Sequence, residues 1–220
     1  MAQLLLVRHA QASFGTADYD RLSELGWRQS RWLGEYFAER GAAFDLVLRG
    51  SLRRHAETLA GIEEGMGARL GQEQDAGLDE YDSQVLLRAH LGEEGLPQGA
   101  DRRAHFRVLR EALHAWTRGT LALEAHQRFD AFRKRVLDAL AVARAGGSER
   151  VLVISSGGPI ATILAEVLGM PARGVVDLNL QARNTGISEL QTGASRIHCV
   201  SFNSVPHLDR PERIAALTYS

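Results

Sequence analysis

The stretch LLLVRHAQAS, from Leu4 to Ser13, places four apolar residues directly before an arginine and a histidine. A short apolar run of this kind is typical of a strand that is buried on both faces of a sheet. In an open α/β sheet, ligands bind at the carboxyl ends of such strands. The sequence therefore predicts a binding site that begins at Arg8 and His9.

Further apolar runs of the same character occur at 46–48 and 151–154, with a weaker run at 197–202. Amphipathic helical patterns separate these runs, and one of them begins after Ser23, a typical N-cap residue, and stops at Gly41. Another has Pro159 in its first turn and ends at Gly169. Strands that alternate with helices predict a three-layer α/β/α sandwich around a mostly parallel sheet.

The C-terminal third of the chain predicts an antiparallel edge to this sheet. Residues 186–190 and 197–202 flank a turn at Thr192-Gly193-Ala194, which favours a hairpin. The polar segment at about 81–125, with GEEGLPQGAD as a loop, predicts a helical insertion over the active end of the sheet. We expect residues 1–220 to form a single domain that carries this insertion.

Composition excludes several classes of protein. The 220 residues carry a formal net charge of −1, which argues against binding to nucleic acid or to an anionic membrane. The single cysteine, Cys199, rules out an internal disulfide and a cysteine metal cluster. No apolar run approaches the roughly 20 residues that span a bilayer, and Arg8 interrupts the N-terminal run too early for a signal peptide. We expect a cytoplasmic protein.

Three predicted strand ends carry groups that suit an oxyanion. The first offers Arg8, His9 and Ser13, the second (VLRGSLRRHAET) offers Arg53 and Arg54, and the third (VLVISSGGPI) offers Ser155, Ser156, Gly157 and Gly158. Arginine binds phosphate through two parallel hydrogen bonds and keeps its charge when partly desolvated. A neutral histidine nitrogen can attack phosphorus, and arginines can supply the neutralising charge without a metal. The pattern indicates phosphoryl transfer with no cofactor.

These residues resemble the signatures of the histidine phosphatase superfamily, which includes cofactor-dependent phosphoglycerate mutase. The family's opening strand and Arg-His-Gly motif resembles LLVRHA, with Ala10 in place of glycine, and its Leu-Thr-Glu-x-Gly element resembles LSELG at 22–26. The family's Ser-Pro-Leu-x-Arg-Ala-x-x-Thr element matches residues 50–58, with Gly50 and Ser51 in place of serine and proline. The resemblance covers nearly the whole chain in the same order.

The resemblance implies a role for each matched residue. His9 would attack phosphorus and form a phosphohistidine, while Arg8 and Arg54 would hold the phosphoryl oxygens. The family's Leu-x-Glu element matches GLDEYD, which makes Glu80 the expected proton donor, with Asp79 and Asp82 as rivals. Ser13 is expected either to bind a phosphate oxygen or to cap the loop.

The family's second histidine, which follows the fourth strand of the family's fold, is absent from the matching position after residues 151–154. Ser156 and Gly157 occupy the matching positions, and we expect them to contact the phosphoryl group. A serine hydroxyl donates a neutral hydrogen bond, which is about half as strong as the charged bond of a histidinium. His55 could replace the lost imidazole, but one step along a helix from Arg54 rotates its side chain by about 100°, which favours another direction.

The sequence thus predicts a metal-independent phosphatase that hydrolyses a phosphomonoester through phospho-His9. The alternative is a catalytically weakened domain of the same fold that binds phosphorylated ligands or has a regulatory role. A phosphoglycerate mutase fits less well, because that enzyme has Gly-Glu-Ser after Arg-His where this chain has Ala10, Gln11 and Ala12. The expected partner is a small phosphorylated substrate or inorganic phosphate, and the sequence is compatible with an oligomer.

Overall fold

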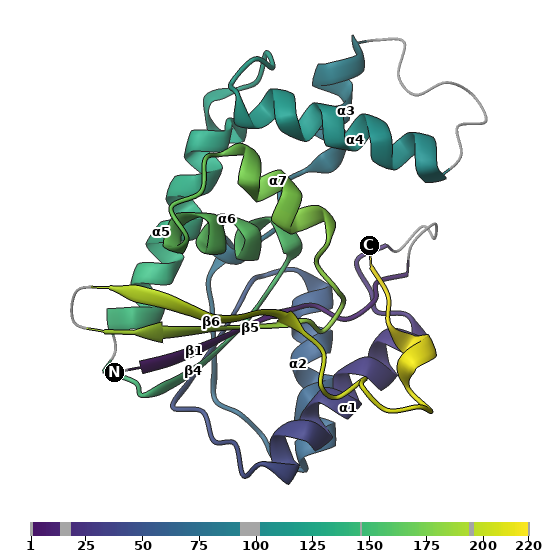
Figure 1. Ribbon diagram of the computed structural model, residues 1–220, viewed down its shortest axis with the longest axis vertical. Coiled ribbons are helices and arrows are strands. Elements are labelled where there is room, and N and C mark those ends of the chain that lie inside the picture. Colours follow the sequence, from purple (N-terminus) through teal and green to yellow (C-terminus); the bar gives the residue numbers. More distant parts are fainter. Residues whose placement is uncertain (1, 14–18, 93–101, 146, 194–195, 220) are drawn as a thin grey trace.

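The computed structural model describes residues 2–13, 19–92, 102–145, 147–193 and 196–219. Within these residues, six strands form one sheet in the order β3-β2-β4-β1-β5-β6 (Figure 1). The strands are β1 (Ala2–Arg8), β2 (Leu46–Arg49), β3 (Gln72–Gln74), β4 (Arg150–Ser155), β5 (Ile187–Thr192) and β6 (Ile197–Ser204).

The sheet is mostly parallel. Strands β1, β4, β2 and β3 pair in parallel, and β5 pairs antiparallel with both β1 and β6. Strand β1 lies inside the sheet between β4 and β5, so its carboxyl end opens at the middle of the sheet edge. The parallel sheet and the antiparallel β5–β6 hairpin confirm the expected fold class.

Helices cover both faces of the sheet (Figure 1). Helices α1 (Glu24–Glu39) and α2 (Arg53–Met66) pack on one face, and α5 (Phe129–Ala145), α6 (Gly157–Val167) and α7 (Arg173–Leu180) lie on the other. Helices α3 (Ser83–Leu91) and α4 (Arg102–Thr117) extend that second layer away from the sheet. Short 3₁₀ turns occur at Ala76–Leu78, Ala125–Gln127 and Ile214–Ala216.

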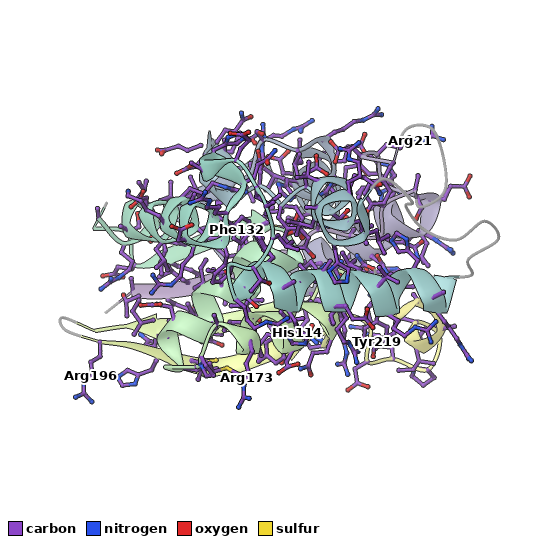
Figure 2. The ribbon with its side chains drawn as sticks, turned by 90° about the horizontal axis from the view of Figure 1, so that it is seen from above. Arg21, His114, Phe132, Arg173, Arg196 and Tyr219 are labelled. Carbon is purple, nitrogen blue, oxygen red and sulfur yellow. The ribbon has the colours of Figure 1, made fainter. Side chains whose placement is uncertain are left out.

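Alternation along the strands divides the core into two parts. On β1, Leu4 and Leu6 belong to the larger cluster under α5 and α6, whereas Val7 belongs to the smaller cluster under α1 and α2. Successive strand residues point to opposite faces, so one apolar run supplies both layers. Figure 2 shows the side chains that fill the larger layer, where Phe132 is buried, while Arg173 and Arg196 point outward at the periphery.

Helix termini follow the expected signals. The Ser23 side chain accepts a hydrogen bond from the Gly26 N–H and caps α1, and Gly41 just beyond that helix has a φ of +59°. Pro159 lies in the first turn of α6, and Gly169 beyond its end has a φ of +64°. Glycine adopts this left-handed conformation without the steric cost that a Cβ brings.

Other expectations were incomplete. Strand β3 was not predicted from the sequence. Parts of the predicted GEEGLPQGAD loop and of the Thr192–Ala194 turn lie outside the described residues. The segment at about 81–125 contains α3 and α4. Its identity as an insertion in a single domain stays a proposal. Among the residues that the structure describes, no helix is long and apolar enough to cross a membrane.

Candidate active site

A cavity of 790 Å³ opens at the carboxyl ends of the strands. Arg8 and His9 at the end of β1, Arg54 in the first turn of α2, and Glu80 after the first 3₁₀ turn all line it. The structure therefore brings together four candidate residues that lie up to 72 positions apart, between Arg8 and Glu80. Further out, the wall is partly apolar and includes Phe106, Leu109 and Leu180.

His9 is held in the orientation that a nucleophile needs. Its Nδ1 lies 2.8 Å from the Ala10 carbonyl oxygen, so Nδ1 carries the proton and donates it there. Nε2 is then left with a free lone pair. The backbone N–H of His9 donates to the Ser155 carbonyl at 2.8 Å, and its own carbonyl accepts from Asn184 Nδ2 at 3.2 Å. These bonds fix the residue between β4 and the segment that leads into β5.

The electrostatic surroundings keep His9 neutral. Burial lowers the pKa of the His9 imidazole well below its ordinary value, and the nearby charges of Arg54 and Arg8 lower it further. Only 4% of His9 and 6% of Arg8 is exposed, so both groups act in a desolvated environment where electrostatic interactions are strong. A neutral imidazole beside two guanidinium groups suits attack on a phosphate.

Thr58 couples the Arg54 segment to the His9 loop. Its Oγ1 accepts the Ala10 N–H at 3.0 Å and donates to the Arg54 carbonyl at 2.6 Å. The Arg54 guanidinium donates to Asp20 Oδ1 at 2.7 Å. A threonine one helical turn after the arginine suits this position, since its single hydroxyl oxygen accepts from one backbone group and donates to another.

Glu80 lies at the N-terminus of α6, where the Gly158 N–H is 3.2 Å from both carboxylate oxygens. Burial raises the pKa of Glu80 above its ordinary value, although Arg54 and the Gly158 hydrogen bond oppose this shift. Its two rivals are engaged elsewhere. Asp79 accepts the Ser51 N–H at 2.6 Å, and Asp82 accepts the Gln84 and Val85 N–H groups and caps α3. Glu80 and Asp82 both line the cavity, whereas Asp79 is not among its lining residues.

The remaining candidates lie behind or beside the cavity. Ser13, Ser156 and Gly157 are not among the residues that line it. The backbone N–H of Ser13 donates to the Arg21 carbonyl at 2.9 Å, and Ser156 is fully buried. A Cβ on Gly157 would lie 2.3 Å from Asn179 Oδ1, so glycine at this position allows α7 to approach the start of α6.

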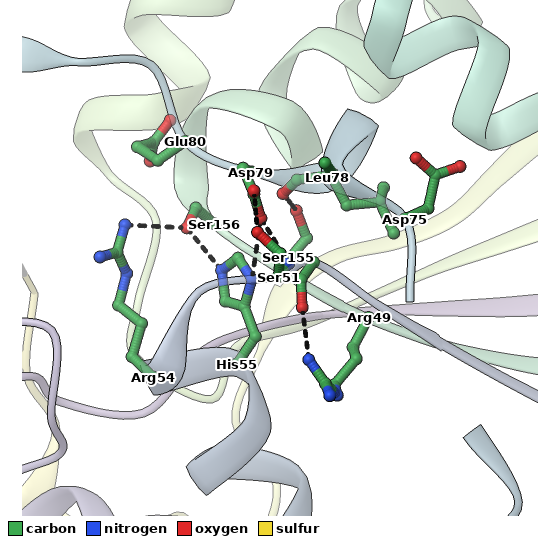
Figure 3. A network of polar contacts seen from close by, with 12 residues as sticks. Arg49, Ser51, Arg54, His55, Asp75, Leu78, Asp79, Glu80, Ser155 and Ser156 are labelled. Atoms are coloured by element: carbon green, nitrogen blue, oxygen red, sulfur yellow. Dashed lines mark hydrogen bonds and ion pairs between the residues drawn. The ribbon is translucent and has the colours of Figure 1, made fainter. Parts of the chain in front are cut away.

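The expected direction of His55 was wrong. Its Nε2 lies 2.8 Å from Ser156 Oγ, and its ring centroid lies 5.8 Å from that of His9 (Figure 3). Ser156 Oγ also accepts a hydrogen bond of 3.4 Å from Arg54 Nη2. The imidazole that the sequence lacks after β4 is thus present beside the same spot, supplied by α2.

Sequence reasoning also missed residues that shape the site. Asn184 Nδ2 donates to the His9 carbonyl. His105 also lines the cavity. Tyr81 and Asn179 line it too and are joined by a hydrogen bond of 2.8 Å. Of these residues, Tyr81 was the easiest to predict as part of the site, because it directly follows Glu80 in the sequence.

The model of the histidine phosphatase superfamily (branch 1) matches residues 4–205. The chain belongs to this superfamily. No curated protein matches it. Among solved structures, a phosphoserine phosphatase variant of Entamoeba histolytica in complex with phosphoserine is 18% identical, with a TM-score of 0.66 over 94% of this chain and 100% of that one.

Two other solved structures carry different substrate names. A putative alpha-ribazole-5'-P phosphatase of Escherichia coli is 20% identical, with a TM-score of 0.67 over 92% of this chain and 96% of that one. A mycobacterial glucosyl-3-phosphoglycerate phosphatase in complex with inorganic phosphate is 21% identical, with a TM-score of 0.64 over 95% and 100%. At these identities the likeness shows that the histidine phosphatase fold is shared.

Proposed function

We propose that this histidine phosphatase superfamily member is a metal-independent phosphomonoesterase that works through a phosphohistidine on His9. The observation that carries the proposal is the His9 imidazole, whose Nδ1 is committed to the Ala10 carbonyl while Arg8 and Arg54 flank it in one cavity. That arrangement supplies a nucleophilic nitrogen and two phosphate-binding cations at the same point.

In the first half-reaction, His9 Nε2 attacks phosphorus as the ester oxygen leaves on the opposite side. Arg8 and Arg54 neutralise the charge on the phosphoryl oxygens, which is the main requirement of phosphoryl transfer. Glu80 protonates the leaving alcohol, because its raised pKa keeps a proton available closer to neutral pH. The products are the free alcohol, phospho-His9 and the Glu80 carboxylate.

In the second half-reaction, the Glu80 carboxylate takes a proton from water, and the resulting hydroxide equivalent attacks phosphorus. The P–N bond to His9 breaks, inorganic phosphate leaves, and Glu80 has regained its proton. The two halves use one carboxyl group in opposite directions, so each turnover restores the starting protonation states.

The cavity supports a phosphomonoester whose alcohol has an apolar part. Its 790 Å³ exceed what a phosphate group needs, and Phe106, Leu109 and Leu180 contribute apolar wall. A phosphoglycerate is small and wholly polar, so this wall favours a phosphatase over the mutase alternative. We also propose a small phosphorylated substrate as the partner and retain the cytoplasmic location as a prediction.

The second candidate function is a domain that binds phosphorylated ligands without turnover, and the replacement of the second histidine by Ser156 is what favours it. The experiment compares wild type with His9→Ala on an aryl phosphate and on a panel of phosphorylated metabolites. The phosphatase predicts phosphate release that is lost in His9→Ala. Phosphate binding by both proteins with no release by either supports the binding domain instead.

A further inference from the structure

Four departures from the family's motif pattern lie in one cluster. That pattern has serine, proline and alanine where this chain has Gly50, Ser51 and His55, and a histidine where it has Ser156. Positions 50, 51 and 55 belong to one motif, but position 156 follows a different strand. In the structure, Gly50 and Ser156 lie against the His55 imidazole, and Ser51 holds Asp79 beside it. Figure 3 shows His55 with Ser51, Asp79 and Ser156.

Ser51 places a carboxylate behind the imidazole. Its backbone N–H donates to Asp79 Oδ1 at 2.6 Å, and its hydroxyl donates to Asp79 Oδ2. A proline has no N–H and cannot make the first of these bonds. So held, Asp79 Oδ1 lies 3.8 Å from His55 Nδ1.

Gly50 makes room for the ring. A Cβ at this position would lie 2.3 Å from His55 Nδ1 and 2.6 Å from Asp79 Oδ1. Real Cβ atoms essentially never approach other atoms this closely, so a serine here would push the imidazole or the carboxylate aside. The glycine and the histidine are therefore compatible with each other, whereas the family's serine is not compatible with this ring position.

Ser156 completes the arrangement from the other side. Its Oγ lies between His55 Nε2, at 2.8 Å, and Arg54 Nη2, at 3.4 Å. Both His55 and Ser156 are fully buried, so a second imidazole at position 156 would have to enter volume that the His55 ring fills. The small residue after β4 and the large one on α2 are complementary.

We propose that His55, acting through the Ser156 hydroxyl, replaces the family's second histidine at the phosphoryl group. This proposal rests on the phosphatase function proposed above and adds a positioning residue, His55, to its machinery. Ser156 does not line the cavity, so the relay requires a bound phosphoryl oxygen to reach its hydroxyl beside Arg54 Nη2. Asp79 Oδ1, 3.8 Å from His55 Nδ1, faces the charge that His55 acquires. Arg54 sits beside the same hydroxyl and keeps its role on the phosphate.

In this relay, the proton that His55 gains comes from the phosphate group of the substrate. The relay starts from the Nδ1–H tautomer of neutral His55, in which Nε2 accepts the 2.8 Å hydrogen bond from Ser156 O–H. A phosphate monoanion brings one P–OH proton, which passes to Ser156 Oγ as the Ser156 proton passes to Nε2. The O–H bond on phosphate breaks, an N–H bond forms, and the serine exchanges one proton for another. The result is a phosphate dianion that accepts from Ser156 O–H, which in turn accepts from the His55 imidazolium.

The charged groups around His55 explain why it needs the phosphate to become protonated. Burial, together with the charges of Arg54 on its own helix and Arg49 on β2, lowers its pKa to about 3, although a hydrogen bond to the Gly50 backbone opposes this shift. Asp79 faces Nδ1, and the neutral His9 ring lies on the remaining side. A bound phosphate adds negative charge beside Arg54 and offsets the cation that opposes protonation of His55.

The first test is a double-mutant cycle on one aryl phosphate and one alkyl phosphate. We expect His55→Ala and Ser156→Ala each to lower kcat by about 10²-fold or more, the size found when one transition-state donor is removed. Because the two act as one unit, the double variant should be no slower than the slower single variant. His55→Gln, which hydrogen-bonds but carries no extra proton, should stay slow. Wild-type rates in His55→Ala, or losses that multiply, would overturn the proposal.

The second test restores the family residues. Ser156→His alone should lower activity, because two imidazoles compete for one space. The variant with Gly50→Ser, Ser51→Pro, His55→Ala and Ser156→His should regain kcat to within about tenfold of wild type, since the charged donor then comes from position 156. A gain of activity in Ser156→His alone would contradict the proposal, because it would show that the space is free.

The third test does not need turnover. Nitrogen-15 NMR of the imidazoles at pH 6 should show His55 neutral in the free protein and shifted toward imidazolium with saturating inorganic phosphate. His207 is a matched control, because it is equally buried, has Thr185 Oγ1 at 2.8 Å from Nε2, and has its pKa lowered to about 3. It does not line the cavity and should stay neutral.

The outcomes separate the two proposals. If His55 gains a proton on phosphate binding but no ester is hydrolysed, the phosphatase function fails and the relay at the phosphate site stands. If esters are hydrolysed in a His9-dependent way while His55 stays neutral and His55→Ala is as fast as wild type, the function stands and the relay fails.

Discussion

Glu80 and Gly158 are joined by a forked contact in which one backbone N–H lies 3.2 Å from both carboxylate oxygens. The contact holds the carboxyl group at the N-terminus of α6, where Glu80 lines the cavity. A helix N-terminus stabilises negative charge, and burial works against it. Because burial is the larger effect, the pKa of Glu80 is raised.

We expect Glu80→Gln to slow alkyl phosphates by about 10²–10⁴-fold, the usual contribution of general acid catalysis, and activated aryl phosphates far less. Only a poor leaving group needs the proton. Initial rates on both ester classes measure the difference. Equal slowing of the two classes would remove Glu80 from the acid role and assign it a structural one, or point to Asp82.

Gly158→Ala tests the same contact from the backbone. The added Cβ would lie 2.2 Å from Glu80 Oε1 and 2.8 Å from the Tyr81 ring, so the carboxylate must move. Alanine is favoured over glycine inside a helix by about 1 kcal/mol, which offsets part of the strain in the fold. We expect a small change in Tm and a loss of activity concentrated on alkyl phosphates.

The control for that variant is Gly71→Ala, where the added Cβ meets nothing within 4 Å. It should leave both Tm and activity close to wild type. If Gly158→Ala keeps full activity on alkyl phosphates, Glu80 does not need its present position.

A third prediction concerns stability in acid. Burial lowers the pKa values of His55 and His207 to about 3, from 6.5 in an unperturbed imidazole. The unfolded chain then binds more protons than the folded one below about pH 6.5. The stabilisation is complete above that pH and is lost as the pH falls toward 3, at about 1.4 kcal/mol per pH unit for each histidine.

Urea unfolding between pH 7.5 and pH 5 measures this slope. His207→Gln should reduce the slope by one histidine's share, whereas His126→Gln, which changes an exposed side chain, should leave it unchanged. An identical slope in His207→Gln would mean that the buried imidazole titrates at its ordinary pKa.

The apolar cavity wall predicts the fourth result. Phe106→Ala should raise KM for aryl phosphates by about five- to thirtyfold, which corresponds to about 1–2 kcal/mol of lost apolar burial. The phosphoryl groups do not touch this wall, so kcat should change little. Methyl phosphate serves as the control ester, since it has no apolar part to bind there. Equal KM changes for both esters would exclude Phe106 from the alcohol subsite.

The elements that could be predicted are those marked by a local sequence pattern, such as an apolar run or an N-cap residue. Strands β1 and β4 are continuous apolar runs because helices cover both faces of the sheet at these strands. The N-cap residue Ser23 marks the start of α1. Strand β3 was missed because its three residues, Gln72–Gln74, are polar and exposed at the sheet edge, where no apolar pattern is required.

The candidate site was predictable where a residue acts alone. Arg8, His9, Arg54 and Glu80 could be located from motif order, and the structure places them along one cavity. The His55 contact was not predictable, since helical rotation gives a direction around the helix axis but not the space that a neighbouring strand end leaves open. Ser156 leaves that space, and no local pattern links positions 55 and 156.

The contact between His55 and Ser156 bears on how relatives of this fold are sorted into enzymes and inactive homologues. A rule that scores each sequence column separately counts Gly50, Ser51, His55 and Ser156 as four independent losses, and rejects the chain for its missing histidine. A rule that asks whether a second imidazole lies beside the His9 ring finds one at 5.8 Å and retains the chain. Searching families for such spatial exchanges would recover chains whose catalytic groups have changed helix but not location.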